Sequence, residues 1–214
     1  AAGLGLGLLT VGLERLGESL GICAGDVAVA QSGSGANGVG KAHLSVGTAT
    51  WIGLSTARFV NDPIKPFWGL NHIDPRRWIL AGEMETGGGA LMWFRDVFCQ
   101  EEARQAEQAG LSTYQLLSRM VDSVDPGSDR LLFAPWLSGE RAPVLDHYAR
   151  GAWVGLTLSH TKAHLARSVM EGVAYHMRWI CESIEALGLR IGPVHAICGG
   201  STSPVWTQIL SYVM

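Results

Sequence analysis

The sequence predicts an α/β domain, and three observations carry this prediction. Hydrophobic residues make up 47% of the 214 positions and charged residues 16%, which is enough apolar side chain to bury a sizeable core. Apolar runs of strand character occur along the chain, and segments of helical periodicity lie between and after them. The expected strands lie at 21–24, 43–54, 78–82, 131–136 and 194–198, and the expected helices at 88–109, 112–124, 161–187 and 204–214.

The charge and cysteine content favour a small-molecule ligand and a cytoplasmic location. The formal net charge is −3 and Lys and Arg form no cluster, whereas a nucleic-acid or anionic-membrane surface needs a concentrated basic face. The four cysteines form no C-x-x-C pair, which favours reduced, buried thiols. The sequence has no uninterrupted run of about 18 apolar residues, the length that a membrane span needs.

Both ends of the sequence indicate a piece of a longer protein. The opening AAGLGLGLLTVGLERLG has neither an initiator Met nor the basic leading region of a signal peptide. The last stretch, SPVWTQILSYVM, is a helical pattern that stops at Met214 without a glycine cap or a polar tail. We therefore expect residues 1–214 to form one domain that is truncated at both ends.

The first expected strand leads into the stretch AGD. An acidic residue at the carboxyl end of a strand stands where α/β sheets tend to bind ligands, which makes Asp26 a candidate site residue. From the residues alone, a helix N-cap is the commoner role for such an aspartate, so both roles stay open. The segment DVAVAQSGSGANG then predicts a short helix that runs into a flexible turn.

The glycine run in that turn fits two phosphate-binding motifs. Gly33, Gly35 and Gly38 have the spacing of G-x-G-x-x-G, while Gly35, Gly40 and Lys41 fit a Walker A loop up to its last position. Both motifs need a buried strand before the glycines and a helix after them, whereas here a helix precedes and a β-rich segment follows. The residue after Lys41 also lacks the hydroxyl that Walker A loops place on magnesium. We therefore expect both matches to be coincidental.

Two other turns are better candidates for a ligand site. The stretch SVGTAT places Gly47 and Thr48 at the tip of a β-hairpin, where backbone N–H groups and a hydroxyl can hold a phosphate. The stretch VHAICGGSTSPVW reads as a short strand, a Gly-Gly turn and a helix with Ser203 as N-cap and Pro204 in its first position. The free N–H groups of such a helix start favour nucleotides, although an ordinary connection is the alternative.

Between these turns, the segment 161–187 gives the clearest helix prediction. Its apolar residues recur every three or four positions along one stripe, and Gly188 supplies a left-handed stop. The stripe consists of Leu165, Val169, Val173, Met177, Ile180, Ile184 and Leu187.

Six motifs, in this order, resemble the C-terminal half of FGGY-family carbohydrate kinases, most closely the xylulose kinase group. They spread over residues 23 to 212, and the run from Gly151 through Glu171 fits the family's second signature. The motifs are AGD, SVGTATW, ETGGGALMWFRD, FAPWLSGERAPVLDHYARG, GLTLSHTKAHLARSVMEGVAYHMR and CGGSTSPVWTQIL. The resemblance implies an actin-like (ribonuclease H-like) domain that holds the nucleotide. The N-terminal domain, which would hold most of the sugar, is absent from these residues.

The resemblance also implies roles for single residues. By position, Asp26 matches the general base that acts on the sugar hydroxyl, so it also contacts the substrate. ATP is the implied phosphoryl donor, with magnesium bound mainly through its phosphates and waters. The residues that match nucleotide contacts are Gly47 and Thr48 in the hairpin, Gly88 in the motif TGGGALMW, and Gly199, Gly200 and Ser203 in the adenosine-side turn.

Several positions depart from the family pattern. Cys198 stands where many members have a glycine, and Met92 stands where glycerol kinase-like members carry a polar contact. Val27 lacks the amide that some members use on the substrate, which argues against glycerol. Glu140 and Arg141 in the loop WLSGERAP are expected to order the wall of the cleft and not to take part in the chemistry.

The implied function is ATP-dependent phosphorylation of a sugar hydroxyl, on a ketose such as xylulose or on a related polyol. A non-catalytic actin-like module that binds ATP or a partner is the alternative. The expected partners are the sugar, ATP and the missing N-terminal domain, with a homodimer left open. Without that domain, residues 1–214 are expected to be inactive, and the residues that select the sugar are expected to lie in it.

Overall fold

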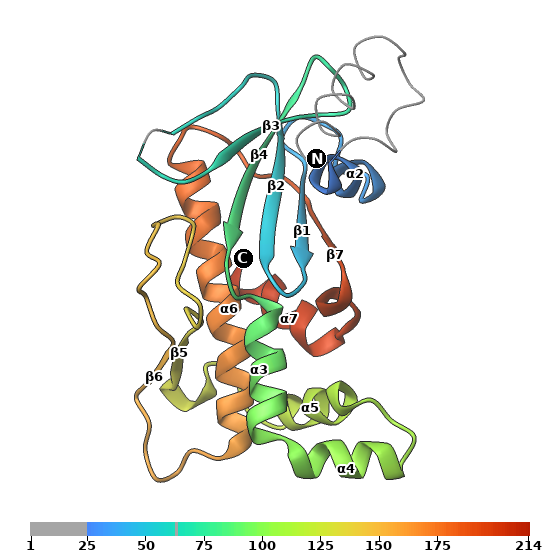
Figure 1. The fold of residues 1–214 in the computed structure, drawn as a ribbon, viewed down its shortest axis with the longest axis vertical. Coiled ribbons are helices and arrows are strands. Elements are labelled where there is room, and N and C mark those ends of the chain that lie inside the picture. The colour runs from blue at the N-terminus through green and yellow to red at the C-terminus, as the bar shows by residue number, and fades with distance from the viewer. Residues whose placement is uncertain (1–24, 63) are drawn as a thin grey trace, which may run out of the picture.

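The computed structural model describes residues 25–62 and 64–214, and Figure 1 shows how their elements are arranged. The expected strand at 21–24 lies outside the described residues. The predicted α/β class is correct, because a mixed sheet is combined with helices over most of the chain. In Figure 1 the sheet fills the upper part of the view, helices α3 to α5 lie below it, and α6 runs past both.

The central sheet has five strands in the order β3-β4-β2-β1-β7. Neighbouring strands are antiparallel from β3 to β1, and β7 pairs parallel with β1. The expected strand at 43–54 is a hairpin of two strands, with its turn at residues 47–49. The strands are β1 (Ala42–Val46), β2 (Thr50–Thr56), β3 (Trp68–Asn71), β4 (Trp78–Met84) and β7 (Val194–Ile197).

Most of the helices follow the predicted segments. A short two-stranded ribbon, β5 (Leu132–Ala134) with β6 (Ala152–Val154), lies outside the main sheet. The helices are α2 (Asp26–Gly33), α3 (Gly88–Phe98), α4 (Gln100–Gln108), α5 (Thr113–Asp122), α6 (Lys162–Glu185) and α7 (Pro204–Val213), with the short turns η2 (Ser128–Arg130) and η3 (Gly199–Thr202).

Helix α6 is the centre of the core. It packs against β2 and β4 of the sheet and against α3, α5 and α7. Val169, Val173, Met177, Ile180 and Ile184 of the predicted stripe are fully buried, and burial of each such side chain stabilises the fold by about 1.5–3 kcal/mol. After the helix, Gly188, the predicted stop, has a φ of +78°, in the left-handed region that glycine adopts without strain.

Two parts of the prediction need correction. The helix expected at 88–109 is two helices. Cys99 has non-helical φ and ψ, and the side-chain Nε2 of Gln100 donates to the carbonyls of Asp96 and Val97 at the end of α3. Strands β3 and β6 were not expected, because they are short and largely exposed and so carry no hydrophobic pattern.

No helix in the described residues is long and apolar enough to cross a membrane.

Candidate functional site

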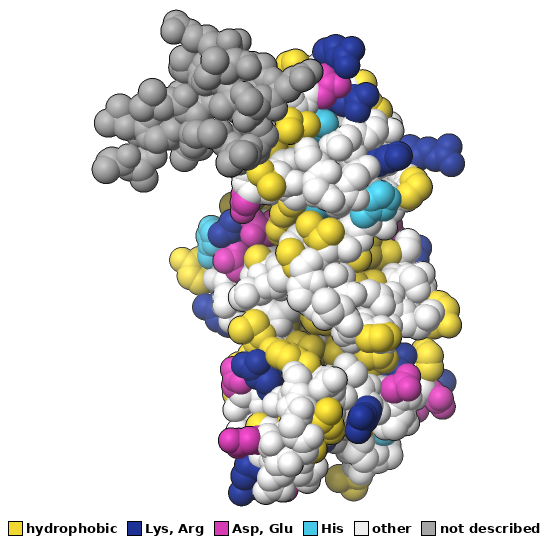
Figure 2. All heavy atoms as spheres, turned by 90° about the vertical axis from the view of Figure 1, so that its right-hand side faces the viewer, with side chains coloured by type: hydrophobic (Ala, Val, Ile, Leu, Met, Phe, Trp, Pro, Cys, Tyr) yellow, Lys and Arg dark blue, Asp and Glu magenta, His cyan; other side chains and the backbone are white. Residues whose placement is uncertain are grey.

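A cavity of about 770 Å³ lies between the β1–β2 hairpin and helices α3, α5, α6 and α7. Turned so that the β7 side faces the viewer, Figure 2 shows this face hollowed about halfway down, with hydrophobic side chains at the hollow. The structure brings to this cavity six residues that the sequence singled out from three separate turns: Gly47, Thr48, Gly88, Gly199, Gly200 and Ser203.

The hairpin turn rests directly on the start of α3. The amides of Gly88 and Gly89 donate to the carbonyl oxygens of Gly47 and Thr48 over 2.8 and 2.9 Å. A Cβ atom on Gly88 would lie 2.3 Å from the carbonyl oxygen of Gly47, so only glycine permits this contact. The amides of Gly47 and Thr48 donate to no group of the described residues. They are available to an acceptor in the cavity.

The second turn approaches the same strand from the other side. A Cβ atom on Gly200 would lie 2.2 Å from Cγ1 of Val46, the last residue of β1, so this contact also requires glycine. Within the described part of the chain, the amides of Gly199 and Gly200 have no hydrogen-bond acceptor. Ser203 caps α7 as predicted, with its hydroxyl 3.4 Å from the amide of Trp206.

The residue before this turn is strained. Cys198 has φ +71° and ψ −176°, a region of backbone conformation that is essentially reserved for glycine. Its thiol is exposed and lies 3.2 Å from the hydroxyl of Ser45 on β1. The sequence marked Cys198 as a departure from a glycine of the FGGY pattern, and the backbone shows why glycine fits there better.

The remaining walls are mostly apolar, with a polar end. Leu91 and Met92 of α3, Met170 of α6 and Trp206 of α7 line the cavity. Met92 also accepts a hydrogen bond from the Thr48 hydroxyl, with 3.8 Å between sulfur and oxygen.

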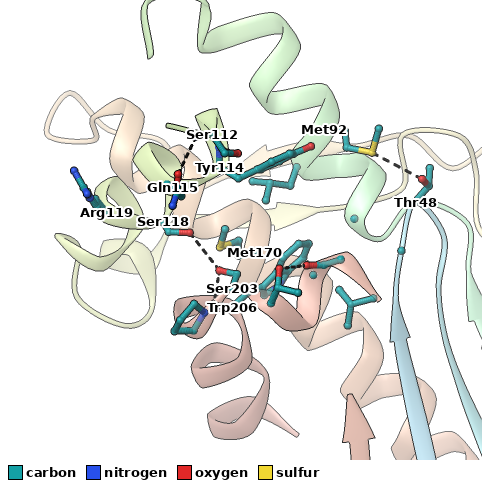
Figure 3. Close-up of a pocket in the computed structure, with 18 residues that line it drawn as sticks. Thr48, Met92, Ser112, Tyr114, Gln115, Ser118, Arg119, Met170, Ser203 and Trp206 are labelled. Atoms are coloured by element: carbon teal, nitrogen blue, oxygen red, sulfur yellow. Dashed lines mark hydrogen bonds between the residues drawn. The ribbon is translucent and has the colours of Figure 1, made fainter. Parts of the chain in front are cut away.

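Helix α5 supplies the polar end, which the sequence did not predict. Tyr114, Gln115, Ser118 and Arg119 all line the cavity, and Figure 3 shows Arg119 at the opposite end from Thr48. The Ser118 hydroxyl lies 3.3 Å from that of Ser203, which joins α5 to the second turn. The capping box formed by Ser112 and Gln115 could have predicted the start of α5, but not that its side chains reach this cavity.

Asp26 lies apart from these residues. It is the first residue of α2, it is exposed, and it is not among the residues that line the cavity. The N-cap of α2 is Gly25, so the capping role that stayed open for Asp26 is wrong. The Asp26 carboxylate accepts only the amide of Val27 among the described residues, at 2.9 Å. It is therefore available to a ligand from outside the domain.

Lys41 occupies a different part of the structure from the cavity. It directly precedes β1, while Gly47 and Thr48 follow the other end of that strand. A strand rises about 3.3 Å per residue, so Lys41 and Thr48 are separated by roughly 20 Å. The helix that a Walker A loop requires after its glycines is replaced by β1. The motif match therefore lacks the structure that would give Lys41 a phosphate to bind.

A charged cluster lies at the end of β4, just before the glycines of α3. Arg141 forms ion pairs with Glu83, over 3.1 Å, and with Glu85. Burial is the main cause that raises the pKa of Glu83; Arg141 opposes it, and the charges of Glu85 and Asp26 add to it. Burial likewise raises the pKa of Glu140 to about 7, against the hydrogen bonds that its carboxylate accepts. These contacts agree with the expected ordering role of the loop.

The described residues hold no group of three or more His, Cys, Asp or Glu side chains that could bind a metal ion. No Asp or Glu is among the residues that line the cavity. A divalent ion at this site would therefore depend on ligands other than carboxylates of the cavity wall.

The chain belongs to the FGGY family of carbohydrate kinases, since residues 42–214 match the model of that family's C-terminal domain. It is 36% identical to a gluconokinase of Bacillus subtilis over 140 residues, which are 65% of this chain and 27% of the relative. It is 31% identical to a xylulose kinase of Escherichia coli over 187 residues, 87% of this chain and 36% of the relative.

The crystal structure of a xylulose kinase from Rhodospirillum rubrum superposes with a TM-score of 0.73 at 29% identity, covering 86% of this chain and 35% of that one. The predicted fold, an actin-like (ribonuclease H-like) domain of a sugar kinase, is therefore correct. The chain spans between about a quarter and two fifths of the length of the curated relatives it matches.

Proposed function

We propose that this chain forms the ATP-binding part of an enzyme that transfers the γ-phosphoryl group of ATP to a sugar hydroxyl. The observation that carries the proposal is the convergence of two glycine turns on one cavity, each with backbone amides that have no acceptor among the described residues. Unpaired N–H groups on rigid turns favour phosphate oxygens and other acceptors. Family membership supports the same reaction class.

The two turns would contact different parts of the nucleotide. The amides of Gly47 and Thr48, with the Thr48 hydroxyl, would hold the phosphates, and Gly88 would keep the hairpin close to α3. Gly199, Gly200 and the apolar walls would take the adenosine, as in nucleotide sites built on strand–glycine–helix turns.

Magnesium fits this site through the phosphates and water. Because no carboxylate lines the cavity, we propose no protein cage for the ion, and Thr48 is the nearest candidate for a hydroxyl contact. When bound, the ion would bridge the phosphates and neutralise charge that develops during transfer.

Asp26 is proposed as the general base. Its carboxylate is exposed and accepts a single hydrogen bond, so it can receive the proton of a sugar hydroxyl presented from outside the domain. We propose that the N-terminal domain of the sugar kinase presents that sugar and closes over the cavity. A ketose such as xylulose is the first candidate, and gluconate is the second because the chain is 36% identical to a gluconokinase.

The alternative is an actin-like module that binds ATP without catalysis, and Asp26→Asn separates the two. In the complete enzyme, Asn keeps the size of the side chain but cannot accept the proton, so turnover should fall by roughly 10²–10⁴ while ATP affinity changes little. Asp125→Asn, in the exposed loop after α5, is the matched control. The measurement is ADP release with xylulose, gluconate and glycerol as acceptors.

Each result points to one conclusion. Near-normal turnover of the Asp26→Asn enzyme would remove Asp26 from the mechanism. If the wild-type enzyme binds ATP but shows no acceptor-dependent turnover with a broad panel of sugars and polyols, the non-catalytic alternative is correct. Cytoplasmic location and self-association belong to the same proposal and are tested by fractionation and sedimentation.

A further inference from the structure

Glu140 is a buried acid that the proposed chemistry does not use. It lies in the loop between β5 and β6, and only 4% of its surface is exposed. Its Oε1 accepts the amides of Glu85 and Arg141 over 2.9 and 2.7 Å. One oxygen atom thus ties this loop to the residue that follows β4.

The second carboxylate oxygen faces α6. Oε2 of Glu140 lies 3.3 Å from Nε2 of His176, which also contacts the carbonyl of Ala142 at 2.8 Å. Trp136 donates its indole N–H to Nδ1 of the same ring, so the ring proton belongs on Nε2, toward Glu140 and Ala142. Burial lowers the pKa of His176, which favours this neutral ring. The loop is therefore fixed on both sides of Glu140.

Glu85, whose amide donates to Glu140, leads directly into the candidate ATP site. Glu85 is separated from Gly87 by one residue, and the amides of Gly87 to Gly89 donate to the hairpin carbonyls of Gly47 and Thr48. The amide of Ala142 also donates to the carbonyl of Glu83 over 3.1 Å. Hydrogen bonds therefore link α6 through Ala142 to Glu83, and Glu140 to Glu85, just before the glycines that hold the hairpin.

We propose that Glu140 is a positioning residue for ATP: its Oε1 fixes the backbone on which the Gly47–Thr48 hairpin rests. The proposal builds on the proposed function of the cavity. The important property of Glu140 is the placement of one acceptor oxygen, because the guanidinium of Arg141 is already shared by Glu83 and Glu85. Its charge is not required.

Three variants of Glu140 in the complete protein separate placement from charge. Gln keeps an acceptor oxygen at the same distance and removes the charge. Asp keeps the charge but is shorter by one methylene, so it cannot reach both amides. Ala leaves two amides without an acceptor, and an unpaired buried donor costs about 1–3 kcal/mol. The measurements are ATP affinity by calorimetry and hydrogen exchange of peptides that cover residues 46–50 and 85–89.

The Gln variant should bind ATP about as well as wild type, and the Asp and Ala variants should bind it more weakly. The Ala variant should bind ATP roughly tenfold more weakly, since 1.4 kcal/mol corresponds to a factor of ten. Exchange should increase at both peptides in the Asp and Ala variants. Glu102→Ala is the matched control, because its carboxylate is also largely buried and paired, at 2.7 Å to Lys162, but lies on α4 away from the hairpin. Its exchange should increase near α4 only.

The Asp and Gln variants of Glu140 decide the result even if the Ala variant does not fold. An Asp variant that binds ATP better than the Gln variant would show that the charge matters and would overturn the proposal. Equal ATP affinity and equal exchange in wild type and the Asp variant would overturn it too. A wild-type protein that binds no ATP would instead overturn the proposed function, which is a separate outcome.

Discussion

Cys198→Gly should stabilise the protein, against the usual effect of a glycine substitution. Cys198 adopts φ +71° and ψ −176° directly before the second glycine turn. A side chain in this region of backbone conformation costs about 1–3 kcal/mol, because Cβ is forced close to the backbone. Glycine has no Cβ and removes this strain.

The expected gain is what remains after two losses. Glycine adds freedom to the unfolded chain, which costs about 0.4–1 kcal/mol. The thiol also loses its contact with Ser45, but a thiol is a weak donor and the distance is 3.2 Å, so this loss is small. The net gain in the free energy of unfolding is therefore roughly 1 kcal/mol, or about 2–4 °C in Tm for a domain of this size.

Thermal unfolding by circular dichroism, with Cys198→Ala as the matched control, measures this gain. Ala removes the thiol but keeps Cβ and therefore keeps the strain, so its Tm should equal that of the wild type or fall slightly. A glycine variant that melts below both the wild type and the Ala variant would refute the reasoning, because the backbone at residue 198 would then not be strained.

Two further predictions concern Gly88, where the hairpin approaches α3, and Glu140. Gly88→Ala places a Cβ 2.3 Å from the carbonyl oxygen of Gly47, so we expect a loss of about 1–3 kcal/mol of stability by urea titration and weaker ATP binding by calorimetry. Gly33→Ala, with open space around it, should leave ATP binding unchanged and raise stability by about 0.4–1 kcal/mol, because Ala has less freedom than Gly in the unfolded chain. Glu140→Gln should alter the pH dependence of stability. The pKa of Glu140 is raised to about 7, so the contribution of its protonated form to stability is present at low pH and is lost as pH rises through about 7. The free energy of unfolding of the Gln variant should therefore rise relative to that of wild type between pH 4.5 and 7, by at most about 3 kcal/mol. Parallel stability curves for the two proteins would contradict this.

The sequence predicts the elements whose pattern is local and strong. Helix α6 was expected at 161–187 and spans Lys162–Glu185, because its apolar stripe and its glycine stop are both written in neighbouring residues. The β1–β2 hairpin and the cap at Ser203 were found for the same reason. The break at Cys99 was missed, because the periodicity continues across it and only the contacts of Gln100 reveal the end of α3.

The candidate site was predictable in its turns but not in its walls. Gly88 and Gly200 are conspicuous because glycine is needed where the backbone closely approaches another part of the chain. Tyr114 and Arg119 lie on an ordinary amphipathic helix, and nothing in their spacing says that α5 faces the hairpin. That information is in the tertiary packing of α5 on α6 and α7.

ATP affinity of Thr48→Val and Lys41→Ala in the complete protein tests the central claim most directly. The claim is that the phosphates of ATP lie at the hairpin tip and not at the glycine run before β1. Val keeps the volume of Thr48 but removes its hydroxyl, which should cost about 1–3 kcal/mol, or roughly 5–150-fold in the Kd for ATP. Lys41 is exposed at the other end of β1, so Lys41→Ala should leave the Kd unchanged. If Lys41→Ala abolishes ATP binding while Thr48→Val retains it, the phosphates lie at the glycine run and the account is wrong.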